Sequence, residues 1–578
     1  MKRLPLWACS SMSARRNTPS VRQLLRTTAR HSSASSSHYT LHHHADDATN
    51  LALADIARYL SSQGSSLAQC GLPEPHRHHY DSEVDLELNF FHPHRAVLRA
   101  RADAARARMN ADQLSIFERI LGHQDQRGAA CFFVDGRAGR GKTFLMAALC
   151  DRVRADGGIV CVTGTTALSV IHYERGRTAH SAFGIPVQDN DEGLESKISP
   201  YGARAELLRH AQLIIWEELP MAKKAVLECA NQLLQEIMDN QLPFGGKTFV
   251  GLGDFRQVAP VVRGSSGPSA TLNHSIRSSY LWSHFDILRL TIPIRYAGDV
   301  AYATWVDQLG DGVPPFEAAV PVRHLQHLED MDGAARFLFL DDSLAHSPDA
   351  VRRAFLSPFN ARGLPVKSPP LLMSAQYTNY KEAAYYSHDT IKEMDESTFH
   401  LPTGAEADLL AMLHEPGVPP HNLSLKVGCV ASIMRNLSIE KGLVKNVRVQ
   451  VVNLLANVVQ VCLLQHNQLL TSQTTGEEMQ IFCLPRITFE FRPHRANWTV
   501  QRRQFPLRLA YATTFNSCQG LTLDRVVLDL TMPVFAHGQL YTSLSRVRRG
   551  ADIRILRNPW ESDEPTLNVV YRDLLLPI

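Results

Sequence analysis

The stretch from Gly136 to Thr143 constrains the fold more than any other part of the chain. Its letters, GRAGRGKT, match the pattern G-x-x-x-x-G-K-[ST]. In such a loop the backbone N–H groups surround phosphates, the lysine reaches the β- and γ-phosphate oxygens, and the hydroxyl ligates Mg²⁺ at a helix N-terminus. An apolar run precedes the loop and a helical pattern follows it, which disfavours the alternative of a glycine-rich turn without a ligand. The predicted nucleotide-binding residues are Gly136, Arg137, Ala138, Gly139, Arg140, Gly141, Lys142 and Thr143.

Around this loop, short apolar runs alternate with helical patterns. A helix is predicted from Thr143 to Arg154, with Phe144, Leu145 and Leu149 on one face. Strands separated by helices indicate a mostly parallel, doubly wound sheet, and therefore an α/β fold. A second series of the same kind begins near residue 350. The predicted strands are 131–134, 159–162, 213–216, 248–252, 354–356, 507–510 and 525–528.

Between residues 441 and 504 the hydrophobic pattern changes. Apolar residues there recur at every second position, in place of the earlier succession of strand and helix patterns. Val447, Val449 and Val451 alternate with other residues before Ala456-Asn457, and a similar alternation runs from Val459 to Leu463. This pattern predicts an antiparallel hairpin. We therefore expect a small β insertion at 441–504.

The formal charge of +3 is distributed unevenly over the 578 residues. Residues 1–45 hold seven basic residues, no carboxylate and a serine-rich run at 32–37, so the remainder of the chain is net acidic. This composition is typical of a mitochondrial transit peptide. A disordered basic tail and a wrongly assigned N-terminus are the alternatives. The leader favours a mitochondrial location, with the nucleus as the other expectation.

The cysteines and apolar runs exclude several classes of protein. The ten cysteines include no C-x-x-C pair, which argues against a zinc site and for a reducing compartment. No run reaches about 18 apolar residues, so no membrane span is expected. The arginine- and alanine-rich stretch 95–108 is interpreted as a solvated helix face in preference to a DNA contact.

Two neighbouring acids follow the predicted strand 213–216. Glu217 is expected to hold Mg²⁺ through water, although aspartate is usual there, and Glu218 to polarise the attacking water. Gln257, after the strand 248–252, is a candidate γ-phosphate sensor. Arg295 and Arg546 are candidates for stabilising the charge that phosphoryl transfer develops. With Lys142, these six residues form the predicted catalytic set, and Thr143 and Glu217 the predicted metal ligands.

Taken in order, these segments resemble the superfamily-one DNA helicases of the Pif type, and among them the helicase part of Helitron transposons. The resemblance covers about residues 109–555. It begins with Asn110-Ala111-Asp112-Gln113, and its last matching segment is His537-Gly538-Gln539-Leu540-Tyr541. Between them lie the matching segments 163–167, 177–183, 216–221, 244–257, 308–312, 434–438, 442–446 and 514–522.

The resemblance implies a P-loop NTPase with two tandem RecA-like parallel-sheet domains and a small β-barrel-like insertion in the second. It implies ATP and Mg²⁺ as cofactors, single-stranded and forked DNA as partners, and 5′-to-3′ translocation by a monomer in repair, recombination or telomere maintenance. The implied domains are 1–45 leader, 46–108 N-terminal segment, 109–295 first RecA-like domain, 296–440 and 505–578 second RecA-like domain, and 441–504 insertion.

The resemblance also assigns roles to individual residues. Gln113 would read adenine, Phe183 would offer a stacking surface to a base, and Asn516, Gln519 and Gly520 would couple the DNA and ATP sites. The residues implied to bind DNA are Thr163, Gly164, Thr165, His180, Phe183, Asn516, Gln519 and Gly520.

The sequence departs from the family pattern at Glu217, at Pro293 and at Ser517-Cys518. These departures leave a second hypothesis open, a catalytically decayed transposon-derived remnant that binds ATP and DNA. A P-loop kinase or GTPase is a third alternative, but it needs neither the 514–522 segment nor Arg546.

Overall fold

The computed structural model describes residues 82–124, 130–187, 193–260, 267–296, 298–339, 348–358, 382–393, 405–463, 480–493, 498–558 and 564–577, with isolated positions at 68, 73 and 496. The chain divides into two compact units, 1–86 and 87–578. The leader 1–45 and most of the first unit lie outside the described residues. In the described part, no helix is long and apolar enough to cross a membrane.

The first sheet has six strands in the order β3-β2-β4-β5-β1-β6, and every neighbouring pair is parallel. The non-sequential order arises from helical crossovers, as expected for a doubly wound sheet. The four strands predicted in this region are confirmed. The bounds are β1 Ala130–Gly136, β2 Ile159–Gly164, β3 Arg177–Thr178, β4 Ala211–Glu217, β5 Thr248–Gly253 and β6 Phe285–Leu290.

Helices α6 (Ala111–Gln124) and α7 (Lys142–Ala155) pack beside this sheet. Helix α6 begins with a capping box, in which Gln113 N donates to Asn110 Oδ1 at 3.0 Å and Asn110 N to Gln113 Oε1 at 3.2 Å. Leu145 and Leu149 of α7 are fully buried in the core formed with the strands, as their helical spacing predicts. The other helices of this region are α8 Ala167–Val170, α9 Ala179–Ala182, α10 Ala203–His210, α11 Lys224–Met238 and α12 Pro268–His274.

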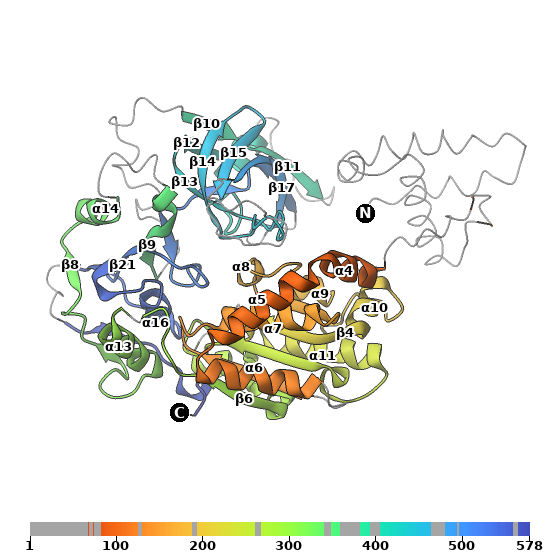
Figure 1. The fold of residues 1–578 in the computed structure, drawn as a ribbon. Coiled ribbons are helices and arrows are strands. Elements are labelled where there is room, and N and C mark those ends of the chain that lie inside the picture. Colours follow the sequence, from red (N-terminus) through yellow and green to blue (C-terminus); the bar gives the residue numbers. More distant parts are fainter. Residues whose placement is uncertain are drawn as a thin grey trace, which may run out of the picture. The chain divides into compact units, whose positions relative to one another are not determined.

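Helix α5 (Arg95–Ala107) follows α4 (Glu83–Phe91) and runs alongside α7 (Figure 1). Arg95 Nε donates to the carbonyl oxygen of Ala155 at 2.8 Å, and Arg99 pairs with Asp156 at 2.7 Å. Arg99 remains 54 % exposed, so a solvated face is compatible with the contacts that these arginines make. They bind the C-terminal end of α7, where the helix dipole favours cations.

The second sheet has five parallel strands in the order β20-β9-β21-β22-β8. The predicted strands 354–356 and 525–528 are confirmed as β9 and β21. Helix α13 (Val300–Asp311) and helix α16 (Gln539–Leu544) share a buried core with these strands. The bounds are β8 Gln326–Leu328, β9 Arg353–Ser357, β20 Ala512–Thr514, β21 Arg525–Asp529, β22 Ile553–Leu556 and α14 Met331–Phe339, with β7 Ala319–Val320 pairing antiparallel to β23 Thr566–Leu567.

Antiparallel strands fill the interval between β9 and β20, so the β insertion is larger than the predicted 441–504 and runs from β10 to β19. The predicted hairpin is confirmed as β14 and β15. The assignment of 507–510 to the α/β part is wrong, because Leu507 of β19 pairs antiparallel with Ile433. The bounds are β10 Glu382–Tyr386, β11 His388–Glu393, α15 Ala405–Met412, β12 Asn422–Lys426, β13 Val430–Ile433, β14 Arg448–Leu454, β15 Val458–Leu463, β16 Gln480–Pro485, β17 Ile487–Phe491, β18 Thr499–Gln504 and β19 Leu507–Leu509.

Candidate functional site

The predicted phosphate loop lies at the carboxyl edge of the first sheet. It follows β1, while Glu217 ends β4 and Asp254 follows β5. Because all six strands are parallel, these ends meet at one edge, where open α/β sheets bind their ligands. The sheet therefore brings together residues that are more than 100 positions apart in the chain.

Two glycines give the loop its shape. Gly139 and Gly141 have φ values of +75° and +84°, which disfavour a side chain. A Cβ at Gly141 would lie 2.5 Å from Gln113 Nε2, so the loop backbone and α6 leave no room for one. The ammonium of Lys142 donates to the carbonyl oxygens of Gly136 and Arg137, the latter at 3.3 Å. The loop thus has the cradle geometry that phosphate binding requires.

The predicted metal ligands share a buried hydrogen-bond partner. Glu217 is 3 % exposed, and burial raises its pKa to about 8, although the hydroxyl of Tyr173 opposes this by donating to Glu217 Oε1. The same hydroxyl is hydrogen-bonded to the side chain of Thr143. Three oxygen-bearing side chains therefore meet beside the phosphate loop.

Oxygen ligands of this kind suit Mg²⁺, which proteins hold through one or two side chains while the nucleotide phosphates complete its coordination. The described residues contain no group of three His, Cys, Asp or Glu side chains able to hold a metal alone. Thr143 and Glu217 therefore fit a magnesium ion that arrives with its nucleotide.

Glu218, the predicted water-polarising residue, has a left-handed backbone with φ +52°. Burial raises the pKa of its carboxyl, while Lys142 and Arg546 act to lower it. Gln519 Nε2, from the segment after β20, lies 3.4 Å from Glu218 Oε2. A residue predicted to couple DNA and ATP thus contacts the residue predicted to activate water.

Asp254 is a fully buried carboxylate at the centre of the site. It accepts hydrogen bonds from Tyr541 Oη at 2.7 Å, Arg256 Nη1 at 3.3 Å and Gln257 Nε2 at 3.3 Å. Burial alone would raise its pKa, but Arg256 and Lys142 hold the pKa below its ordinary value. The other amide atom of Gln257, Oε1, is buried without a partner among the described residues. An acceptor left open in this place fits a sensor that receives a hydrogen bond from water.

The two predicted arginines lie close enough that each affects the site electrostatically. Burial and the charge of Arg546 lower the pKa of Arg295, whose backbone N donates to the carbonyl oxygen of Gly139 at 3.0 Å. Arg546 is 3 % exposed and donates to the carbonyl oxygens of Thr542 at 2.7 Å and Leu521 at 3.2 Å. Arg546 is therefore held by the second sheet's own backbone while its charge reaches Glu218.

Side chains of α13 and α16 contact the phosphate loop directly. Asp307 pairs with Arg137 at 3.0 Å and also with Arg140. The backbone N of Ala138 donates to Tyr541 Oη at 3.3 Å. Sequence reasoning missed Asp307 and Tyr541. The signal for Asp307 was the pair of arginines inside the loop, because buried arginines require carboxylate partners.

The loop 254–258, which follows β5, is also bonded to the second sheet's helices. Val258 N donates to Thr542 Oγ1 at 3.1 Å, and His537 Nε2 to the carbonyl oxygen of Phe255 at 2.7 Å. His537 Nδ1 accepts from Tyr571 N, and burial lowers the pKa of this imidazole to about 4, so it is neutral with its proton on Nε2. A Cβ at Gly538 would lie 2.3 Å from the Arg256 carbonyl oxygen, which shows how closely the two segments approach.

Two residues predicted to bind DNA are inaccessible to it. Thr163 is fully buried and donates to the carbonyl oxygen of Ile215 at 2.9 Å. Phe183 is also fully buried and stacks on Trp216 with centroids 5.5 Å apart, so it offers no face to a base. Both side chains are structural parts of the first sheet, and these two predictions are corrected.

Among the other predicted DNA residues, Gly164 and Gln519 are also buried, whereas Thr165, His180, Asn516 and Gly520 are more accessible. Thr165 and His180 line a cavity of about 170 Å³ together with Lys223, beside Gly164 at the end of β2. Asn516 Oδ1 accepts from Gln539 Nε2 at 3.0 Å, and Gly520 is exposed. Gln113 is committed to the α6 capping box, with Nε2 3.4 Å from the Arg140 carbonyl oxygen, and adenine recognition by it stays a prediction.

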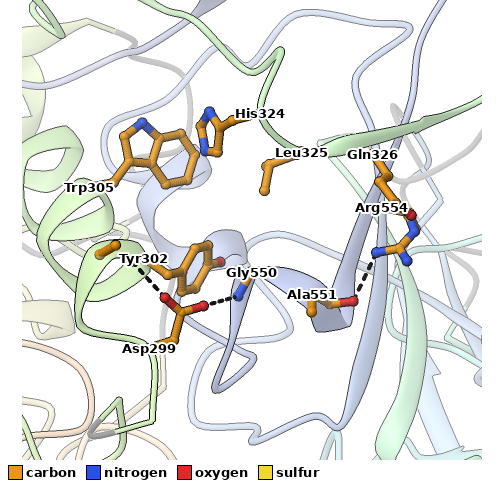
Figure 2. Close-up of a pocket in the computed structure, with 10 residues that line it drawn as sticks. Asp299, Tyr302, Trp305, His324, Leu325, Gln326, Gly550, Ala551 and Arg554 are labelled. Atoms are coloured by element: carbon orange, nitrogen blue, oxygen red, sulfur yellow. Dashed lines mark hydrogen bonds between the residues drawn. The ribbon is translucent and has the colours of Figure 1, made fainter.

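A larger cavity, of about 410 Å³, lies in the second sheet's domain and contains none of the predicted site residues. Figure 2 shows Trp305 and His324 on one side of it and Arg554 on the other. Asp299 caps α13 by accepting from Tyr302 N, and it also accepts from Gly550 N, both at 3.0 Å. These two bonds give the Asp299 carboxylate a structural role at the edge of this cavity.

Comparison with known proteins shows what this chain is similar to. The family model described as PIF1-like helicase matches residues 108–318, and the model described as DNA helicase Pif1, 2B domain, matches residues 408–454. The first match contains the phosphate loop and the six-stranded sheet. The second lies inside the antiparallel insertion.

Individual relatives agree with these matches. The ATP-dependent DNA helicase Pif1 of Bdellovibrio bacteriovorus is 26 % identical over 430 residues, covering 73 % of this chain and 83 % of that protein. The human ATP-dependent DNA helicase PIF1 is 23 % identical over 474 residues, covering 80 % of this chain but 62 % of that protein. The chain thus spans less than two thirds of the human relative's length.

Solved structures show the same fold. The crystal structure of Pif1 helicase from Candida albicans has a TM-score of 0.54 at 22 % identity, covering 79 % of this chain and 97 % of that one. The Bacteroides Pif1 bound to ssDNA has a TM-score of 0.52 at 20 % identity, covering 81 % and 94 %. With two parallel sheets and an antiparallel insertion, the chain is similar to PIF1-like helicases over residues 108–318 and to their 2B domain over 408–454.

Proposed function

We propose that this chain hydrolyses ATP between its two parallel sheets and uses the energy to move 5′-to-3′ along single-stranded DNA and unwind duplex. The observation that carries this proposal is the contact between Gln519 and Glu218. It joins the second sheet's DNA-coupling segment to the group that would activate water on the first sheet. The ATP-dependent DNA helicases among its relatives support the same activity.

In this mechanism each sheet contributes separate groups to one reaction. Lys142 and the loop amides bind the phosphates, and Glu218 takes a proton from the attacking water. Thr143 and Glu217 would hold Mg²⁺, which would supply neutralisation of the phosphate charge. Arg295 and Arg546 stabilise the charge that develops on the transferred group. Stepping follows if the two sheets bind DNA with different affinities before and after hydrolysis.

The decayed remnant, which would bind ATP and DNA without turnover, is the second hypothesis. The complete set of Lys142, Glu218, Gln257, Arg295 and Arg546 around one loop favours the active enzyme. DNA-stimulated ATP hydrolysis that disappears in Glu218→Gln would exclude the remnant, because the glutamine keeps the shape of the side chain but cannot accept a proton.

The direct test is unwinding of 5′-tailed and 3′-tailed duplexes by the wild type and by Lys142→Ala. We expect the wild type to open the 5′-tailed duplex and Lys142→Ala to open neither. Unwinding from the 3′ tail alone would contradict the proposed polarity.

We further propose a role in DNA repair, recombination or telomere maintenance, in the mitochondrion or nucleus, by analogy with the family. The particular resemblance to Helitron helicases stays a prediction. Residues 1–45 fused to a fluorescent reporter should direct it to mitochondria. A diffuse reporter would contradict the transit interpretation.

A further inference from the structure

Tyr173 places one hydroxyl between the two side chains predicted to ligate magnesium. It is 4 % exposed and lies in the turn between α8 and β3. Its O–H donates to Glu217 Oε1, and its oxygen is also hydrogen-bonded to Thr143. A tyrosine has a single proton to donate, so Thr143 must be the donor in the second bond. The hydroxyl therefore orders both ligands at once.

Glu217 needs such a partner more than an aspartate would. Its side chain has an additional methylene, and hence another rotatable bond, between the backbone and the carboxylate. Among the described residues, Tyr173 is the only side chain that donates a hydrogen bond to this carboxyl group, and the neighbouring Glu218 acts with burial to raise the pKa of Glu217. Without the tyrosine, nothing described would select one orientation of Glu217.

The turn that carries Tyr173 is itself fixed. The backbone N of Tyr173 donates to the carbonyl oxygen of Val170 at 3.1 Å, and its ring packs in the core of the first sheet. On either side, Glu174 pairs with Arg101 of α5 at 3.3 Å, and Arg175 pairs with Glu87 of α4. The position of the hydroxyl is therefore set by the protein scaffold before any nucleotide binds.

We propose that Tyr173 is a positioning residue for the magnesium ligands, orienting the Glu217 carboxylate and the Thr143 hydroxyl that would hold a magnesium–nucleotide complex. The inference rests on the proposed ATPase function and adds a residue to it. Partners that orient metal ligands typically change metal affinity by roughly 10- to 100-fold when removed.

The experiment measures metal binding and does not depend on turnover. Mn²⁺ is titrated into the full-length protein with ADP, and free Mn²⁺ is followed by electron paramagnetic resonance. We expect Tyr173→Phe to weaken Mn²⁺ binding by roughly 10-fold or more, with ADP affinity in EDTA changed less than about two-fold. Tyr302→Phe is the matched control, because it also removes one buried hydroxyl, which donates to the Leu544 carbonyl oxygen at 2.8 Å.

A double-mutant cycle shows whether Tyr173 acts through Glu217. In a Glu217→Ala background, Tyr173→Phe should change Mn²⁺ affinity less than about two-fold, because the partner is already gone. Equal effects in both backgrounds would overturn the proposal, as would a Tyr173→Phe protein that binds Mn²⁺ like the wild type.

Folding and function are controlled separately. If Tyr173→Phe does not fold, Glu217→Asp replaces it, since the shorter side chain withdraws from the tyrosine while keeping its charge. Its Mn²⁺ affinity should fall at least about five-fold, and an unchanged or higher affinity overturns the proposal. Magnesium-dependent ATP hydrolysis by the wild type, measured in parallel, tests the proposed function itself. An active wild type with an unaffected Tyr173→Phe refutes only the positioning role.

Discussion

The first sheet, β1 to β6, and the second, β8, β9 and β20 to β22, meet at the same phosphate loop in different ways. The first contributes the ends of its strands: the loop after β1, Glu217 at the end of β4 and Asp254 after β5. The second contributes side chains from helices, among them Asp307 of α13 and Tyr541 of α16. A backbone edge is rigid, whereas side-chain contacts exchange readily. We therefore expect the nucleotide to change the second set of contacts.

The largest expected effect tests whether the second sheet takes part in chemistry at all. Arg546→Ala should lower kcat for ATP hydrolysis by about 10³-fold, because arginines that stabilise transferred phosphoryl groups have effects of this size. ATP affinity should change far less. Single-turnover hydrolysis with excess enzyme measures the effect. If kcat decreases by less than about ten-fold, the second sheet does not supply a catalytic group through Arg546, and catalysis is confined to the first sheet.

The next prediction concerns the stability of the contact between the sheets. Arg256 Nε donates to Asp311 Oδ1 at 2.6 Å, and both side chains are buried. Asp311→Asn should lower the free energy of unfolding by about 3 kcal/mol, because it breaks the buried ion pairs of this carboxylate with both Arg256 and Arg137, and Asp254 compensates only Arg256. Urea unfolding measures the change.

The control for this prediction is Asp286→Asn. It removes an exposed pair with Arg119 within the first sheet's own region, with side chains 52 % and 40 % exposed. Pairs of this kind contribute less than about 1 kcal/mol. An equal loss of unfolding free energy in the two variants would show that the buried Asp311 pair stabilises the protein no more than an exposed pair does.

The smallest effect is a dependence on pH at the same contact. Burial lowers the pKa of His537 to about 4, so the folded protein disfavours the charged imidazole, and nearby Asp254 only partly offsets this. The stabilisation is complete above the unfolded value of about 6.5 and is lost as the pH falls towards 4, which predicts a loss of about 2 kcal/mol at pH 5 relative to pH 7.5.

His537→Gln serves as the reference for that measurement, since an amide can still donate to the Phe255 carbonyl oxygen but does not titrate in this range. The difference in unfolding free energy between wild type and variant should therefore shrink in acid. A difference that is constant from pH 7.5 to pH 5 would show that His537 is not the titrating group.

The first sheet was more predictable from the sequence than the second. Its strands follow one another with local signals, so the strand ending at Glu217 and the phosphate loop were placed correctly. The second sheet is assembled around a long insertion, and the short run 507–509 has the same apolar pattern whether its neighbour is parallel or antiparallel. Local periodicity therefore does not show whether this run pairs in a parallel or an antiparallel sense.

Within the site, the sequence predicted residues whose chemistry is tied to a motif, such as Lys142 and Glu218. It did not predict Tyr173 or Asp307, because each acts only through a partner that the fold brings close. Phe183 was misread for the opposite reason. An aromatic residue beside a DNA motif suggests stacking, but burial against Trp216 is decided by packing.

The loop 254–258 belongs to the first sheet by connectivity, yet its hydrogen bonds to His537 and Thr542 attach it to the second. The boundary along which the molecule would part during the proposed cycle therefore need not follow the division between its sheets in sequence. If the break falls on the α16 side of the loop, Gln257 stays with the nucleotide. If it falls on the β5 side, Gln257 moves away with the second sheet. Its separation from the γ-phosphate would then be part of the step.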